Sequence, residues 1–321
     1  MLAELSIEEL SAAIKEKALQ LGFAGCGISK AEALPQDRQK LEKWLQNGYH
    51  ARMEYMTNHF EKRCDPTLLV EGARSVISLL YNYFTDRVQE DSAAPVLSKY
   101  AYGKDYHLVM KEKMFLLFEY IKTIHPEAGG RVFVDSAPVL DRAWARKAGL
   151  GWIGKNSMLI SRTAGSFVFI GEIVLNLELE YNPIPESDFC GSCTRCIEAC
   201  PTRAILEGRL IDSEKCISYQ TIENRGEISP EIEKKLMGRV FGCDICQDVC
   251  PWNRKAEKHR EEAFNPPGEL LEWSREEWQN MSREQYEILF FQSPVERAGY
   301  DKVKATLSSL QKNQDSAGSL L

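Results

Sequence analysis

The sequence predicts an α+β protein built from an N-terminal α/β domain, a cysteine-rich module and a helical tail. Helical and strand-like apolar patterns alternate up to about residue 180. Eight of the ten cysteines then fall within Cys190–Cys250, and a charged, helix-forming stretch follows. We therefore expect three segments, at residues 1–182, 183–255 and 256–321.

The first elements follow from their local patterns. Apolar residues recur every three to four positions in Leu5–Leu21, which predicts an amphipathic helix that Gly22 ends. Phe23–Ile28 is a short apolar strand, and the surroundings of Leu41–Leu45 are helical. Ser75–Tyr83 is rich in β-branched and aromatic residues, which is typical of a buried strand.

The same alternation continues beyond the polar loop Thr85–Pro95. Helical spacing returns in His107–Ile124, and Arg131–Asp135 is a short strand that ends in an acid. Pro138 suits the first turn of the next helix, and Gly149 suits its C-cap. Two more strands are expected, at Ser157–Ser161 and Ser166–Leu179.

The composition is that of a folded protein. The chain has 321 residues, and 40 Lys and Arg against 47 Asp and Glu give a net charge of −7. This charge argues against nonspecific coating of nucleic acid, although it allows a local basic face. No apolar stretch approaches the roughly 18 residues of a membrane span, and the N-terminus lacks the pattern of a secretory signal. We therefore expect a cytoplasmic protein.

The cysteine spacing predicts two [4Fe–4S] clusters. Cys190–Pro201 has the C-x2-C-x2-C-x3-C-P pattern of two-cluster ferredoxins, in which the fourth cysteine binds the other cluster. Cys216 and the Cys243–Pro251 segment supply a second set. Crossing the sets predicts these ligands: one cluster takes Cys190, Cys193, Cys196 and Cys250, and the other takes Cys200, Cys216, Cys243 and Cys246.

Two zinc sites of four thiolates each are the alternative, although zinc modules rarely use a triple cysteine run with a trailing C-x3-C-P. Cys26 and Cys64 stand alone and are interpreted as small buried residues without a role. A module with two iron–sulfur clusters moves single electrons, so another part of the chain must use them.

Two motifs are interpreted as structural. Gly149–Gly154 matches G-x-G-x-x-G, but a predicted helix precedes it and a strand follows, the reverse of the dinucleotide-binding arrangement. We therefore expect a helix C-cap and a tight turn. Asp105-Tyr106-His107 begins like a cobalamin-ligating Asp-x-His-x-x-Gly loop, but Met110 replaces the glycine. His107 is accordingly expected to be an ordinary residue at a helix start.

Asp135 is the candidate catalytic acid. It ends a predicted strand, at the kind of position where α/β folds open their clefts. We expect partial burial there to raise its pKa, so that the carboxyl could deliver a proton. A structural carboxylate that caps the next helix is the alternative.

Taken together, these residues resemble the epoxyqueuosine reductase family over nearly the whole chain. The cysteine run alone is shared with many redox proteins, but its combination with the Gly-Lys-Asp-Tyr-His and Gly-Lys-Asn segments is much more specific. The matching segments are Glu61–Arg63, Glu71–Ile77, Tyr102–His107, Val134–Asp135, Asp141–Ala143, Ala148–Asn156, Cys190–Pro201, Cys216–Ser218 and Gly242–Pro251.

The resemblance implies an enzyme that reduces epoxyqueuosine at the wobble position of tRNA to queuosine. It implies cobalamin in an N-terminal domain like that of reductive dehalogenases, with no histidine beneath the cobalt, beside a ferredoxin-like module. Asp135 is implied as the proton donor at the cofactor. The other implied cobalamin contacts are Arg63, Ser98, Asn156, Leu159, Ile170 and Ser218. We also expect an external electron donor and a monomer that binds the anticodon stem-loop.

Three alternatives remain open. The first is a cobalamin and iron–sulfur reductase of a small molecule, such as an organohalide. The second is an electron carrier whose N-terminal domain only docks a partner, which a bound corrinoid would eliminate. The third is a zinc-stabilised RNA-binding module, which metal analysis would eliminate.

Overall fold

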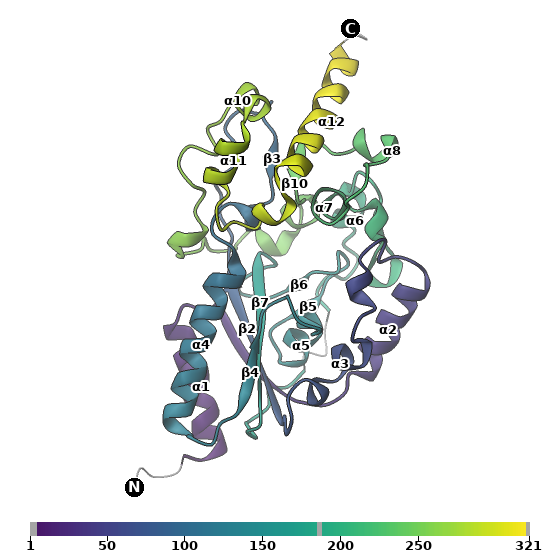
Figure 1. Ribbon diagram of the computed structural model, residues 1–321. Coiled ribbons are helices and arrows are strands. Elements are labelled where there is room, and N and C mark those ends of the chain that lie inside the picture. The colour runs from purple at the N-terminus through teal and green to yellow at the C-terminus, as the bar shows by residue number, and fades with distance from the viewer. Residues whose placement is uncertain (1–4, 185–187, 319–321) are drawn as a thin grey trace.

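A four-stranded sheet forms the centre of the N-terminal half of the chain, with the spatial order β1–β2–β7–β4 (Figure 1). The computed structural model describes residues 5–184 and 188–318, and every neighbouring pair of strands in this sheet is antiparallel. The strands are β1 Gly25–Lys30, β2 Ser75–Asn82, β4 Gly130–Phe133 and β7 Val168–Leu175. All four predicted strands are confirmed, although their ends differ by up to four residues.

Two long helices cover one face of this sheet (Figure 1). They are α1 Ile7–Gln20 and α4 Tyr106–Ile124. Both predicted helices are confirmed, and Ser6 and Asp105 cap them by accepting hydrogen bonds from backbone N–H groups of the first turn. The two helices pack on alternate residues of β2 and β7, as the two-residue period of a strand requires.

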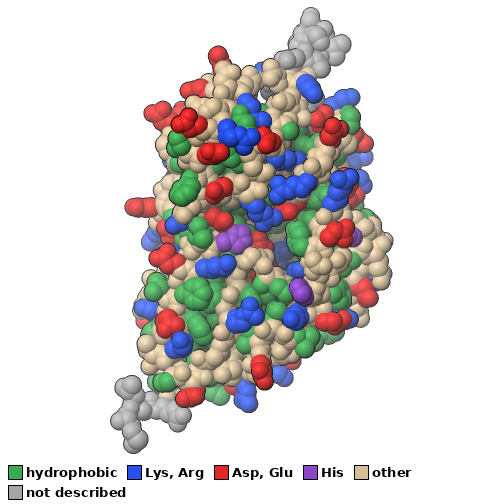
Figure 2. Space-filling view, in the orientation of Figure 1, with side chains coloured by type: hydrophobic (Ala, Val, Ile, Leu, Met, Phe, Trp, Pro, Cys, Tyr) green, Lys and Arg blue, Asp and Glu red, His purple; other side chains and the backbone are tan. Residues whose placement is uncertain are grey.

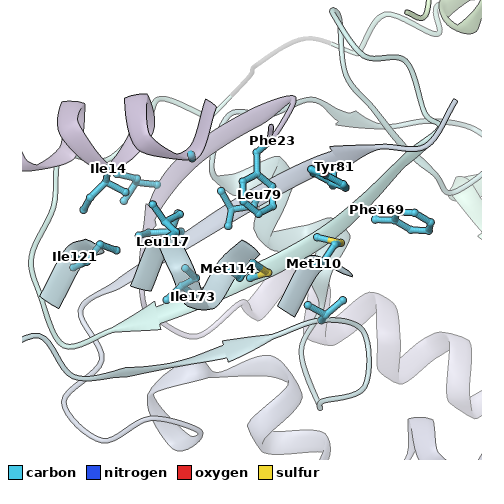
Figure 3. Close-up of a cluster of buried hydrophobic side chains, with 14 of the residues drawn as sticks. Ile14, Phe23, Leu79, Tyr81, Met110, Met114, Leu117, Ile121, Phe169 and Ile173 are labelled. Atoms are coloured by element: carbon cyan, nitrogen blue, oxygen red, sulfur yellow. The ribbon is translucent and has the colours of Figure 1, made fainter. Parts of the chain in front are cut away.

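The core between these helices and the sheet is apolar. Ile14, Leu117 and Ile173 are fully buried and represent α1, α4 and β7 in the same cluster (Figure 3). Gly171 leaves room for Met114, because a Cβ at this glycine would lie 2.6 Å from the methionine sulfur. This part of the structure is a closely packed hydrophobic layer.

Shorter elements cover the other face. They are α2 Pro35–Gln46, α3 Phe60–Cys64, α5 Asp141–Lys147, β5 Trp152–Ile153 and β6 Leu159–Ile160. The end of α5 approaches β1 so closely that a Cβ on Gly27 would lie 2.1 Å from the carbonyl oxygen of Ala148. Gly149 follows α5 with a φ of +81°, and a strand follows it, so the helix C-cap interpretation of the G-x-G-x-x-G segment is confirmed.

The cysteine-rich part and the tail are built from short elements and one long terminal helix. The helices and strands are α6 Arg195–Ala199, β8 Ile205–Leu206, β9 Leu210–Ile211, α7 Ile217–Ile222, α8 Pro230–Glu233, β10 Arg239–Phe241, α9 Ile245–Asp248, α10 Arg275–Asn280, α11 Arg283–Leu289 and α12 Tyr300–Gly318. Short 3-10 helices occur along the chain at Glu54–Met56, Pro66–Leu68, Lys99–Ala101, Glu207–Arg209, Ser213–Lys215, Pro251–Asn253, Glu262–Phe264 and Glu296–Ala298. Within the described ranges, no helix has the length and apolar character needed to cross a membrane.

A second hydrophobic core joins three segments that are distant in the sequence. Residues 94–102 of the predicted first domain pack with residues 217–241 and with the tail up to Leu310. Strand β3, Val96–Leu97, pairs in parallel with β10. The division at residues 182 and 255 stays a prediction, but the hydrophobic cores do not follow it.

Candidate active site

Asp135 lies two residues beyond β4, on the loop that leads to α5. Its φ of +49° is a left-handed backbone conformation, which few residues other than glycine, asparagine and aspartate adopt readily. Val134 before it is fully buried, whereas 59 % of the Asp135 side chain is exposed. The prediction that Asp135 is partly buried is therefore wrong, because the loop turns outward immediately after Val134.

The first turn of α4 holds the Asp135 carboxylate. The Tyr106 hydroxyl donates a hydrogen bond to Asp135 Oδ2 at 2.5 Å, and His107 Nε2 lies 3.8 Å from the same oxygen. Asp105 caps the helix and lies 2.7 Å from His107 Nδ1, which leaves Nε2 facing Asp135. His107 is at a helix start, as predicted, but it also belongs to this site.

Tyr106 was not singled out by the sequence analysis, although it lies in the Gly-Lys-Asp-Tyr-His segment. Its ring stacks on Phe169 of β7 with centroids 4.1 Å apart, which fixes the direction of the hydroxyl. Burial raises the pKa of Tyr106 well above its ordinary value, and the charge of Asp135 raises it further. The phenol therefore stays protonated and acts as a hydrogen-bond donor to Asp135.

The tail and an N-terminal loop complete the surroundings of Asp135. Burial raises the pKa of Tyr55 to about 12, and the charges of Glu223 and Asp135 add to this effect. Arg297, from the tail, pairs with Glu223 and acts electrostatically on both Tyr55 and Asp135. In Figure 2 the visible face is hollowed between its upper and lower parts, and Lys and Arg side chains gather along the upper rim.

Two buried acids lie beneath the Asp135 loop. Glu172 of β7 is fully buried opposite Phe133, the last residue of β4, and its carboxyl faces that of Asp141 at the start of α5. Neither Glu172 oxygen accepts a hydrogen bond from a donor group, and Asp141 Oδ1 also lacks one. Two carboxyls in this position can bond only by sharing a proton.

The pKa values of these two acids agree with a shared proton. Burial raises the pKa of Asp141 to about 6, and the charge of Asp135 adds to the rise. Burial also raises the pKa of Glu172 well above its ordinary value, and the neighbouring Asp141 charge contributes. We assign the shared proton to Glu172. Sequence patterns gave no sign of this pair, because Glu172 lies within an otherwise apolar strand.

The first group of cysteines surrounds Cys250. Burial raises the pKa of the Cys250 thiol, and the nearby thiols of Cys190 and Cys193 raise it further. Burial also raises the pKa of Cys196, with contributions from Cys190 and Cys250. The thiols predicted to hold one cluster therefore act on one another electrostatically, and Cys196 also acts on Cys246 of the other set.

The second group forms around Cys216. Burial raises its pKa and Cys200 adds to the rise, although Cys200 lies in the other sequence motif. Burial raises the pKa of Cys243 to about 12, and that of Cys246 well above the ordinary value, with Cys216 contributing to both. Within residues 5–184 and 188–318, no three His, Cys, Asp or Glu side chains are close enough to hold a single metal ion. The crossed set of ligands stays a prediction.

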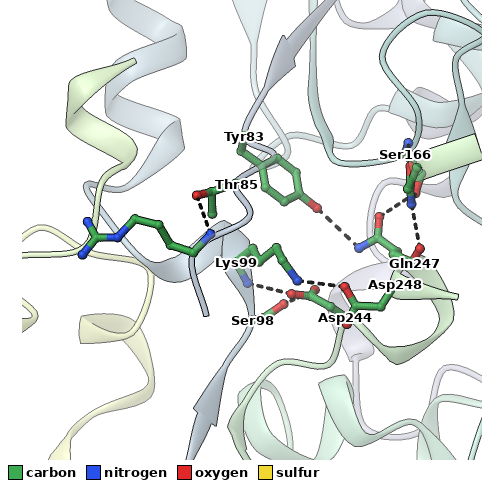
Figure 4. Close-up of polar contacts among 10 residues, drawn as sticks. Tyr83, Thr85, Ser98, Lys99, Ser166, Asp244, Gln247 and Asp248 are labelled. Atoms are coloured by element: carbon green, nitrogen blue, oxygen red, sulfur yellow. Dashed lines mark hydrogen bonds and ion pairs between the residues drawn. The ribbon is translucent and has the colours of Figure 1, made fainter. Parts of the chain in front are cut away.

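A polar network ties the segment after β3 to the second cysteine segment (Figure 4). Asp244, next to Cys243, accepts hydrogen bonds from the Ser98 hydroxyl and from the backbone N–H of Lys99. Lys99 Nζ also pairs with Asp248 at 2.8 Å. Because Ser98 and Asp244 are buried, their bonds fix the position of the cysteine loop relative to the segment that follows β3.

The residues implied to contact cobalamin come from several separate elements. Leu159 and Ile170 share a small apolar cluster on the α5 face of the sheet. Asn156 donates a hydrogen bond to the carbonyl oxygen of Cys246 at 3.4 Å, and the Ser98 hydroxyl is engaged by Asp244. Ser218 lies half-buried on α7, beside Cys216.

Arg63 provides the test of fit for the cofactor. Its side chain is buried and donates one hydrogen bond, to the carbonyl oxygen of Tyr55 at 3.0 Å, while its Nε has no partner among the described residues. A buried donor without a partner is costly. A corrinoid carries amide oxygens and a phosphate that could accept this bond. The residues present therefore fit the group, and the individual cobalamin contacts stay predictions.

Two sequence families match this chain. Residues 63–136 match "Epoxyqueuosine reductase QueG, DUF1730", and residues 189–253 match "4Fe-4S double cluster binding domain". The chain is 49 % identical over 304 residues to an epoxyqueuosine reductase of Cellulophaga algicola, with 95 % of this chain and 99 % of that protein covered. It is 40 % identical to an epoxyqueuosine reductase of Pseudomonas aeruginosa, with 91 % and 82 % covered.

Solved structures agree with these matches. A crystal structure of epoxyqueuosine reductase with a tRNA-Tyr epoxyqueuosine-modified stem loop superposes with a TM-score of 0.89 at 27 % identity, covering 96 % of this chain and 82 % of that one. The enzyme from Bacillus subtilis, with its catalytic aspartate loop swung out of the active site, gives a TM-score of 0.88 at 26 % identity, with 96 % and 82 % covered.

Proposed function

The chain belongs to the epoxyqueuosine reductase family, and from this premise we propose that it reduces epoxyqueuosine in tRNA to queuosine with Asp135 as the proton donor. The observation that carries the proposal is the Asp135 carboxyl, held by Tyr106 and His107 at a site that the tail also reaches. A double-cluster module follows in the same chain.

The reaction removes the epoxide oxygen as water and leaves an alkene, which consumes two electrons and two protons. Cobalamin, when bound, supplies reduced cobalt that can break the strained C–O bond. Asp135, in its protonated form, delivers a proton to the departing oxygen. The Tyr106 hydroxyl orients the Asp135 carboxyl through its short hydrogen bond, and the exposed position of Asp135 lets it regain a proton from water.

The same surroundings suit an anticodon loop. Unpaired bases are recognised by stacking on aromatic rings and by local cations rather than by overall charge. Tyr55 is 47 % exposed, and Arg297 lies near both Tyr55 and Asp135. We assign these two side chains to binding of the RNA next to the modified base. The protein acts as a monomer in the cytoplasm and takes its electrons from an external donor.

Deletion of the gene tests the function directly. Nucleoside analysis of tRNA from the deletion strain should show that epoxyqueuosine accumulates and queuosine is missing. The wild-type gene should restore queuosine, and a gene encoding Asp135→Asn should not. A normal queuosine level in a deletion strain that has no second epoxyqueuosine reductase would refute this function. It would favour the alternative, a reductase of a small molecule.

A cysteine variant tests the crossed clusters. Cys200→Ala should damage the cluster held by Cys216, Cys243 and Cys246, because Cys200 lies beside Cys216. Cys26→Ala is the matched control, since Cys26 is in the hydrophobic core away from both groups. Iron and sulfide analysis with electron paramagnetic resonance would report which cluster is lost. Loss confined to the Cys190 cluster would show that the crossed assignment is wrong. Stoichiometric zinc without sulfide would show that the protein holds zinc instead of the two predicted iron–sulfur clusters.

A further inference from the structure

A surface hollow lies between α6 and α9, the two short helices of the cysteine loops. Its volume is about 500 Å³, and it is lined by Arg195, Glu198, Ala199, Asp248, Val249 and Arg254. We call it the α6/α9 hollow. A smaller hollow of about 240 Å³ shares Asp248 and Arg254 with it and extends to Phe84 and Lys99. None of these lining residues belongs to the surroundings of Asp135 described above.

Both walls of the α6/α9 hollow carry cluster ligands. Helix α6 contains Cys196 and ends beside Cys200, and α9 contains Cys246 and ends two residues before Cys250, so ligands of both predicted clusters lie near its walls. Cys196 and Cys250 belong to the first group of cysteines. The loop between Cys190 and α6 is largely exposed, including Gly191, Ser192 and Thr194. The hollow is therefore a place where another molecule can come close to this cluster without opening the fold.

The charges of the hollow are not balanced. Arg195 and Arg254 are exposed, and neither makes an ion pair with any residue that the structure describes. By contrast, the nearby acid Asp248 pairs with Lys99, and Glu198 accepts a hydrogen bond from Thr194 at 2.5 Å. The Thr194 hydroxyl leaves the charge of Glu198 in place, so Arg195, Arg254 and Lys99 exceed the two acids by one positive charge, in a chain whose net charge is −7.

Additional cations lie beside the same cysteine loop. Lys155 Nζ donates hydrogen bonds to the carbonyl oxygens of Gly191 and Cys193, at 2.7 and 3.0 Å. Arg162 lies over the ring of Phe189, 4.9 Å from its centroid, and Phe189 is itself 40 % exposed. An exposed aromatic ring among cations is suited to a small protein interface, because it offers apolar contact within a charged rim.

We propose that the α6/α9 hollow is the docking site of a small acidic electron-carrier protein, which passes single electrons to the cluster of Cys190, Cys193, Cys196 and Cys250. This inference rests on the proposed function, which needs two electrons for each epoxide. Each docking event oxidises one carrier by one electron and reduces the cluster by one. Two reduced carriers and two protons therefore account for one alkene and one water.

The size and charge of the surface favour a transient protein carrier. Electron-transfer complexes bury little surface, and opposite charges raise their association rates rather than their final affinity. Two exposed arginines over a shallow hollow meet both conditions. An RNA strand is the competing anion, but its modified base must reach Asp135, and the hollow shares no residue with that site.

The experiment uses the cluster-loaded and cobalamin-loaded enzyme with an acidic plant-type [2Fe–2S] ferredoxin as the probe. The charge-reversal variant is R195E/R254E. The control K15E/K111E changes the net charge equally, but on α1 and α4. Stopped-flow absorbance measures cluster reduction by photoreduced ferredoxin, and calorimetry at low and high salt measures binding of oxidised ferredoxin. Dithionite, a small reductant, drives turnover on an epoxyqueuosine stem loop in parallel.

R195E/R254E should associate with ferredoxin at least about tenfold more slowly than wild type and the control, and salt should reduce the difference. Dithionite-driven turnover should be unchanged. Equal ferredoxin rates in all three proteins would overturn the proposal, as would weaker stem-loop binding with unchanged ferredoxin binding. If charge reversal lowers the iron content, R195Q/R254Q replaces it, with the same expected direction. A wild-type enzyme that binds ferredoxin but converts no epoxyqueuosine with dithionite would refute the proposed function and leave the docking site standing.

Discussion

The two faces of the central sheet are built on different principles. On the face covered by α1 and α4, alternate residues of β2 and β7 are apolar, and the buried Ser75 hydroxyl donates to the carbonyl oxygen of Leu177 at 2.7 Å. On the face covered by α5, the buried hydroxyls of Ser29 and Ser78 have no hydrogen-bond partner among the described residues, and the buried carboxyl of Glu172 faces another acid, Asp141. Both faces are formed by the same strands, whose successive side chains point to opposite faces. The two faces therefore differ only in which side chains occupy the alternate positions of each strand.

This difference shows where the fold supports chemistry. Buried polar groups without partners cost free energy, and natural proteins keep them chiefly where they serve a purpose. The buried acids beneath Asp135 belong to the α5 side, and Tyr106 and His107 come from the first turn of α4. The remainder of the α1 and α4 side is apolar and provides stability. Each prediction below tests this division, from the largest expected effect to the smallest.

Asp135→Asn should cause the largest change. The amide keeps the size of the side chain but cannot donate an acidic proton, and general acid catalysis is worth roughly 10²–10⁴-fold, about 3–5 kcal/mol of barrier. Single-turnover oxidation of reduced enzyme by the stem loop should slow by that factor, with cobalt and iron contents unchanged. Asp301→Asn, at an exposed site on α12, is the control. A near-normal rate would make Asp135 structural, and lost cobalamin would make it a cofactor contact.

Leu117→Ala should weaken the apolar face without changing the chemistry. Leu117 is fully buried, and truncation of such a residue costs about 2–5 kcal/mol of unfolding free energy. The neighbouring Leu116 is 53 % exposed, so Leu116→Ala should cost little and serves as the control. Thermal unfolding of the loaded enzyme measures the effect, and turnover per folded molecule should stay the same. A selective loss of turnover would contradict the division between the faces.

Glu172→Gln should remove a pH dependence of stability. Because the pKa values of Glu172 and Asp141 are raised in the folded protein, the folded chain holds protons that the unfolded chain releases at about pH 4. Stability should therefore fall as the pH rises from there through about 6, the folded pKa of Asp141, by at most about 1.4 kcal/mol per pH unit for one proton. The fall should continue above pH 6, because the pKa of Glu172 is raised well above its ordinary value.

In Glu172→Gln the amide can donate to Asp141 at every pH, so the unfolding temperature should change less between pH 6 and pH 8 than in the wild type. Glu178→Gln is the matched control, since Glu178 is 55 % exposed. Parallel curves for wild type and Glu172→Gln would mean that the pair does not share a proton.

The smallest effect separates two serines of one strand. Ser75→Ala should cost about 1 kcal/mol, because it removes a buried hydrogen bond. Ser78→Ala should be neutral or stabilising, because the Ser78 hydroxyl is buried without a partner. Thermal unfolding measures the stability of both variants. Equal losses of stability would show that the Ser78 hydroxyl has a hydrogen-bond partner in the loaded enzyme, contrary to its assignment as an unpaired group of the α5 face.

Local patterns in the sequence were enough to predict the sheet strands, the two long helices and the cysteine groups. In Ser75–Asn82 and α4, the burial pattern and the local propensity agree, so the sequence alone identifies the element. The cysteine spacing similarly reflects the local geometry of a cluster loop. The role of Gly149 as a helix C-cap was predicted correctly, because this role depends only on the helix before it and the strand after it.

The rest depends on contacts between distant residues. Tyr106 and Asp135 are 29 residues apart, and no local pattern connects them. Glu172 lies in an apolar strand, where its neighbours predict burial but not an acid partner on α5. Arg297 reaches the site from the tail, which sequence analysis treated as a separate segment. The exposure of Asp135 was missed because a left-handed turn after Val134 cannot be seen in a strand pattern.

The pairing of β3 with β10 has a consequence for biosynthesis. Residues 94–102 leave the ribosome early, but their hydrophobic partners extend to Leu310, about 200 residues later. At ordinary elongation rates this segment waits on the order of 10–40 s before its core can close. The cysteines between 190 and 250 emerge during that interval, before the tail residues that complete the second core.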